Sequence, residues 1–227
     1  MKKAQWGAIF WMLCVQYFAG EAISIAGWRG PYSISENYIS DLGAVRCGGA
    51  AAGLNGQTGA ICSPLHAAMN TSFVLQGLLI VAGTLCVWPI FPSGRLWAAA
   101  LLLTAVSGLG VFVVGLAPED TMASIHYLGA VENLFCTNAT MVVMGVAMLG
   151  WRRETRLMGA LTLGAGLIGI FGFAFLAVHD YFGLGVGGME RVTAYPFPVW
   201  IAAMGALLFR RGGLVSGMPA KRPKLVS

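Results

Sequence analysis

The feature that most constrains this chain is a series of six long apolar stretches. Each approaches the ~20 apolar residues that a helix needs to cross a ~30 Å hydrocarbon core. In lipid, only helices and closed barrels satisfy their own backbone, and the alternating pattern of barrel strands is missing from the sequence. The sequence therefore predicts an all-α membrane protein, a bundle of six transmembrane helices. The stretches cover about residues 6–27, 72–91, 96–116, 125–150, 157–178 and 195–209.

Composition excludes the main alternatives to a membrane protein. Only 10% of the residues are charged, 57% are hydrophobic, and the mean hydropathy is +0.74. An ordinary soluble domain carries about 25% charged residues, which it needs to cover its surface. A soluble globular enzyme and a disordered chain are therefore both excluded.

Charge sidedness predicts how the chain is oriented. Eleven of the fourteen Lys and Arg residues fall on one side of a six-span chain, and only Arg29, Arg46 and Arg191 fall on the other, together with most of the acids. Because cytoplasmic segments carry the excess of Lys and Arg, we expect both termini to be cytoplasmic in a multi-pass protein of the plasma (inner) membrane. A cleaved signal peptide is the alternative for the first stretch, but Gln16 and Glu21 interrupt its apolar run.

The same pattern divides the chain into two parts. Residues 1–209 are expected to form the transmembrane domain, with outer loops at about 28–71, 117–124 and 179–194. Residues 210–227 are expected to form a basic cytoplasmic tail. The tail has no interleaved aromatic residues, so we interpret it as an anchor to anionic lipid and expect no nucleic-acid partner.

Two cysteines lie in the first outer loop. Cys47 and Cys62 flank a Gly/Ala-rich segment, whereas the other three cysteines lie inside apolar stretches. The outer compartment is oxidising if this is a plasma membrane, so we expect a disulfide that stabilises the fold by ~3 kcal/mol. A zinc site that includes His66 is the alternative, although the spacing fits no standard zinc pattern.

Ionisable residues gather at the outer membrane boundary. All three histidines lie there, each accompanied by acids from an outer loop. Such residues are costly near lipid and often mark a functional site. His126 and Asn133 are seven residues apart and share one helix face, and Glu132 lies about 9 Å below His126. The candidate catalytic residues are Asp41, Asp120 and His126, and the candidate ligand-binding residues are Ser40, Asn70, Glu132, Glu190 and Arg191.

Two kinds of chemistry fit these residues. Asp and His side chains activate water as a general base or hold a divalent metal that does so, although the sequence requires no metal or other cofactor. Arg191 is suited to a bidentate contact with a lipid phosphate. The structural alternative is that the polar residues, including the intramembrane carboxyls of Glu21 and Glu132, only bond to neighbouring helices.

Several short motifs occur in a fixed order along the chain: Ser40-Asp41-Leu42-Gly43, Asn70, Pro118-x-Asp120, His126, Gly188-x-Glu190-Arg191 and Trp200. Their order resembles one known membrane family, labelled domain of unknown function 998. This resemblance implies six spans, and the family has no settled activity. Its architecture is similar to that of GPI-anchor lipid-remodelling proteins, but fold does not fix function. The chain departs from the family pattern in the long Cys47–Cys62 insertion and in Ala117.

Three functions remain open at this point. The preferred one is a non-catalytic module that binds membrane lipid or scaffolds a partner, either another protein or a second copy of the chain. The second is an outer-leaflet hydrolase or transferase that modifies lipid. The third is a small-molecule or ion transporter, but the inner halves of the spans hold no charged residue and Trp88-Pro89 is a single discontinuous-helix signal.

Overall fold

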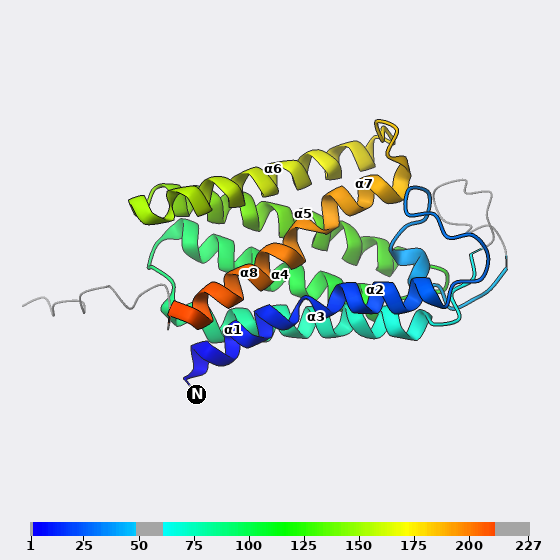
Figure 1. Ribbon diagram of the computed structural model, residues 1–227, viewed down its shortest axis with the longest axis horizontal. Coiled ribbons are helices and arrows are strands. Elements are labelled where there is room, and N and C mark those ends of the chain that lie inside the picture. The colour runs from blue at the N-terminus through cyan, green and yellow to red at the C-terminus, as the bar shows by residue number, and fades with distance from the viewer. Residues whose placement is uncertain (1, 49–60, 212–227) are drawn as a thin grey trace, which may run out of the picture.

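The computed structural model describes residues 2–48 and 61–211. Six helices long and apolar enough to cross a membrane lie side by side, which confirms the predicted bundle, and no strand occurs within these ranges (Figure 1). The predicted tail beyond residue 211 lies outside the described residues. The α-helices are α1 Lys3–Leu13, α2 Gln16–Ala26, α3 His66–Val87, α4 Arg95–Leu116, α5 Ala123–Leu149, α6 Arg156–Ala177, α7 Gly185–Ala194 and α8 Pro196–Arg211. Short 3-10 turns are η1 Ser40–Gly43, η2 Trp88–Ile90 and η3 Arg153–Thr155.

The start of α1 and the end of α8 lie at the same end of the bundle, on the left in Figure 1. We call this the inner end and the opposite one, which carries the first long loop, the outer end. Helices α3, α4 and α5 pack in sequence order, α6 packs on α5 and α7, and α1 fits between α3 and α8. That the inner end faces the cytoplasm stays a prediction from the charge pattern.

The first and last spans are each broken into two helices. In the first span, the amides of Val15 and Tyr17 donate to carbonyls three residues back, at 3.3 and 3.2 Å, so a tight turn separates α1 from α2. In the last span the break falls at Tyr195, before Pro196 and Pro198, which have no backbone N–H to donate. Two of the six spans are therefore discontinuous helices.

The sixth span is longer than the sequence indicated. It begins at Gly185 and not near Tyr195, so α7 occupies residues that were expected to form the third outer loop. Glycines of this segment allow close packing. A Cβ at Gly185 or Gly187 would collide with the backbone carbonyls of Ser35 and Asn37 in the first loop. Glycine therefore lets α7 pack directly against the first loop.

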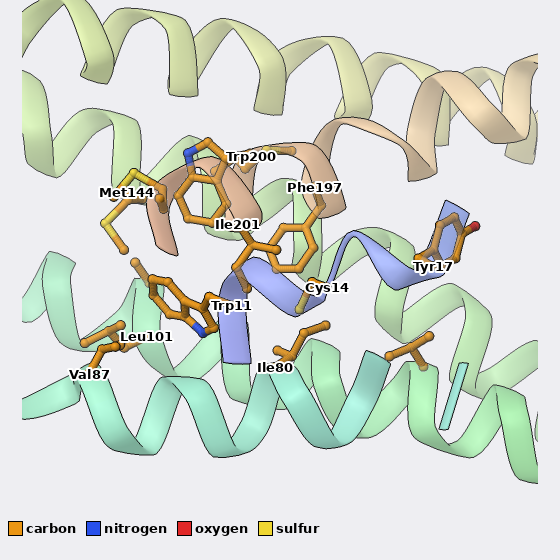
Figure 2. Close-up of a cluster of buried hydrophobic side chains, with 14 of the residues drawn as sticks. Trp11, Cys14, Tyr17, Ile80, Val87, Leu101, Met144, Phe197, Trp200 and Ile201 are labelled. Carbon is orange, nitrogen blue, oxygen red and sulfur yellow. The ribbon is translucent and has the colours of Figure 1, made fainter. Parts of the chain in front are cut away.

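The inner half of the bundle is a packed apolar core (Figure 2). Trp11 of α1, Val87 of α3, Leu101 of α4, Met144 of α5 and Ile201 of α8 are at most 1% exposed. Figure 2 shows these side chains converging from different helices, with Tyr17 at the edge of the cluster. The polar side chains described next lie toward the outer end from this core.

Candidate functional site

Residues 39–43 fold over the outer end of the bundle, and we call this segment the outer cap. It contains the turn η1, and Ile39 and Leu42 are 2% and 0% exposed. The amide of Ile39 donates to the Glu190 carboxylate of α7, and Asn70 Nδ2 of α3 donates to the carbonyl of Gly43 at 2.9 Å. The Ser-Asp-Leu-Gly motif is thus held by both neighbouring helices, and Asn70 acts as one of its anchors.

Arg191 is the centre of a buried polar cluster that joins α2, α7 and the first loop. Its Nη2 lies 3.0 Å from Glu21 Oε1, and the two residues are 5% and 4% exposed. Its Nε donates to the hydroxyl of Tyr195 at 3.0 Å, and its Nη1 donates to the carbonyls of Ile34 and Asn37 at 3.0 and 2.9 Å. These donors, which the sequence assigned to a lipid phosphate, are therefore engaged within the protein.

Asp41 faces a second carboxyl across the outer cap. Its Oδ2 accepts hydrogen bonds from the Tyr38 amide at 2.9 Å and from Asn37 Nδ2 at 3.2 Å, and its side chain is hydrogen bonded to Glu119. Two carboxyls share a hydrogen bond only when one of them carries a proton. Burial raises the pKa of both side chains, and the charge of Asp41 adds to the strong rise in the pKa of Glu119.

Asp120 anchors a different part of the first loop. Its carboxylate accepts the amides of Val45 at 3.1 Å and of Arg46 at 2.7 Å, immediately before Cys47. Cys47 is disulfide-bonded to Cys62, as predicted. Asp120 therefore ties the second outer loop to the segment that carries the disulfide.

A cavity of about 60 Å³ lies beneath the outer cap, with walls from α2, α3, α4, α5, α7 and α8. A buried water needs ~10–15 Å³ on this measure, so the space suits about four waters or a small polar group. The walls are mixed, with apolar side chains such as Ile80 and Val114 between the polar ones. Its polar lining residues are Ser40, Gln76, His126, Asn133, Thr137 and Glu190.

Of the three candidate catalytic residues, only His126 lines this cavity, whereas Asp41 and Asp120 do not. The predicted common face of His126 and Asn133 is confirmed, because both side chains contribute to the wall. His126 is fixed by a 2.8 Å bond between Nδ1 and the carbonyl of Ala117, at the end of α4. The sequence therefore predicted that the candidate residues gather at the outer end of the bundle. It did not predict which polar side chains line the same cavity.

Glu132 lies outside the cavity, between α5 and α4. A Cβ at Gly110 of α4 would overlap its carboxyl group, and its Oε1 is buried without a hydrogen-bond partner. Within the described residues, no group of three or more His, Cys, Asp and Glu side chains is placed to hold a metal ion. The divalent metal considered from the sequence thus has no such ligand set in this part of the chain.

Fold and site together define a six-span membrane protein with a folded outer cap over a polar cavity. The chain belongs to the family described as "Protein of unknown function (DUF998)", which matches residues 13–207. No curated protein and no solved structure is similar enough to count as a match. The family resemblance predicted from the motifs is confirmed, while the expected similarity to GPI-anchor remodelling proteins stays a prediction.

Proposed function

We propose that this protein is a non-catalytic membrane module that holds the polar end of a membrane lipid in the cavity beneath the outer cap. The observation that carries this proposal is the mixed lining of the cavity, in which Gln76, His126 and Glu190 alternate with Phe73 and Phe197. Ligand sites typically combine apolar walls with a few polar groups that fix orientation. Such a lining suits an amphiphile better than an ion or a fully polar solute.

The hydrogen bonds and ion pair that the acidic residues form within the protein favour binding over catalysis. Asp41 and Asp120 accept hydrogen bonds from loop amides, and Arg191 is paired with Glu21. A hydrolase would need a base and its partners within hydrogen-bond reach of one substrate position. The proposed module uses these residues to hold the loops in place. Ligand contact is left to His126 and Glu190, which line the cavity, although Glu190 also accepts the amide of Ile39.

Transport is the second candidate, because two broken spans border the cavity. In several transporter folds, discontinuous helices form the substrate site near the membrane midplane. Against this stands the inner apolar core, in which Trp11 and Met144 are 0% exposed. A flux assay in vesicles separates the two: a transporter moves the bound compound across the membrane, whereas a binding module retains it.

Cavity filling tests the proposal. Ala130 of α5 lines the cavity, so Ala130→Leu places three more carbon atoms in it without removing a polar group. We expect the variant to co-purify with much less lipid than the wild type, measured by mass spectrometry of extracted lipids. The matched control is Ala160→Leu on the exposed face of α6. Equal lipid content and composition in all three proteins would refute the proposal.

A further inference from the structure

Two polar side chains of α5 that line the cavity use their hydrogen-bond donors within the protein. Asn133 Nδ2 donates to the carbonyl of Ser107 at 2.8 Å, and the Thr137 hydroxyl donates to the carbonyl of Asn133 at 2.8 Å. Because a carbonyl only accepts, these assignments are fixed. The amide oxygen of Asn133 and the lone pairs of Thr137 therefore remain as acceptors at the cavity wall.

His126 also uses a hydrogen-bond donor within the protein and keeps an acceptor. Its Nδ1 lies 2.8 Å from the carbonyl of Ala117, so Nδ1 carries the hydrogen. In the neutral imidazole, Nε2 is then an acceptor. A further acceptor comes from the break in the last span, because Ala194 lines the cavity and the residue four positions on is Pro198, which has no N–H to donate to its carbonyl.

Glu190 adds a carboxyl group to these acceptors, and its ionised form can serve as the counter-ion of a bound cation. One carboxylate oxygen accepts the amide of Ile39. Among the described residues the one ion pair is that of Arg191 with Glu21. Arg191 also acts electrostatically on the carboxyl of Glu190, which forms no ion pair of its own in this part of the chain. Tyr17 and Phe73 line the same space, and aromatic faces attract cations. The remaining donors at the wall are the Tyr17 hydroxyl, the Ser40 hydroxyl, which is hydrogen bonded to Glu119, and the amide of Gln76, whose oxygen accepts from Gln16.

We infer that the cavity binds a primary ammonium group, with Glu190 as its counter-ion and His126, Asn133 and the carbonyl of Ala194 as acceptors for its N–H groups. This inference rests on the proposed function and names the chemistry of the bound polar end. A primary ammonium brings three donors and a positive charge to a small site rich in acceptors. A trimethylammonium group brings the charge without donors, and a phosphate or glycerol group lacks the charge.

Two sources carry this group, an aminophospholipid headgroup and a free small amine. The test adds phosphatidylethanolamine, phosphatidylcholine or phosphatidylglycerol with identical acyl chains to the full-length protein in detergent, and ethanolamine in a separate arm. Binding is measured by native mass spectrometry and by the ligand-dependent rise in Tm. We expect phosphatidylethanolamine to bind best and Glu190→Gln to weaken it about 30-fold, as expected for loss of one partner of a buried charge pair.

The control Glu132→Gln removes a carboxyl from α5 that does not line the cavity, and it should bind like the wild type. Binding of ethanolamine but not of phosphatidylethanolamine supports the inference and assigns a free amine, which refutes a lipid ligand. Equal binding of all three phospholipids, unaffected by Glu190→Gln, overturns the ammonium inference but leaves lipid binding intact. Binding of no compound refutes both. The lipid comparison on the wild type alone decides the inference if Glu190→Gln fails to fold.

Discussion

Replacement of Arg191 by methionine should be the most damaging single change at the outer end. Met retains much of the apolar stem but leaves Glu21, which is 4% exposed, as a buried charge without a partner. It also removes the donors to the carbonyls of Ile34 and Asn37. Breaking a buried ion pair by removing one partner costs about 3–5 kcal/mol, so we expect the free energy of unfolding to fall by that amount and Tm by roughly 6–20 °C.

A double-mutant cycle in detergent tests this reasoning. Glu21→Gln combined with Arg191→Met should cost about 1–3 kcal/mol less than the sum of the two single changes, because the second change removes the unpaired charge that the first one creates. Arg29→Met, at an exposed position of the first loop, is the matched control and should change Tm little. If Arg191→Met behaves like the control, or if the two single effects simply add, the buried cluster does not stabilise the fold as argued.

Two further predictions concern the outer loops. The pKa values of Asp41 and Glu119 are raised in the folded protein, so these carboxyls stay protonated at pH values where the unfolded chain has already released its protons, above about pH 4. Their contribution to the free energy of unfolding is therefore full below about pH 4 and declines as the pH rises toward the pKa values of the folded state. Glu119→Gln should flatten the Tm–pH curve and raise Tm at pH 7, whereas Glu154→Gln at the exposed inner end should leave the slope unchanged. Reduction of the Cys47–Cys62 disulfide should cost about 3 kcal/mol, measured as a Tm difference with and without reductant, and an unchanged Tm would refute it.

The spans were predictable because every segment that crosses the hydrocarbon core must be long and apolar, and the hydropathy of the sequence shows such segments directly. The disulfide was predictable because both cysteines fall in one outer loop. The start of α7 was not, because its glycines indicate a loop equally well as a helix in close contact with Ser35 and Asn37. Close packing of distant segments leaves no local pattern in the sequence.

The site was predictable only in part, for a related reason. Ser40, His126 and Glu190 lie on the cavity, and the spacing of His126 and Asn133 pointed to a shared face. The partner of Arg191 is Glu21, which lies 170 residues away, and no periodicity connects them. Gln76 and Thr137 were missed because neutral polar residues in a span look like ordinary helix contacts.

A high-resolution experimental structure in a lipid nanodisc containing phosphatidylethanolamine tests the central claim most directly. We predict density for the polar end of a lipid beneath the outer cap, within hydrogen-bond distance of Glu190 and His126. A cavity that contains only water, or one filled by the protein's own side chains, with every lipid confined to the outer surface of the helices, would contradict the account.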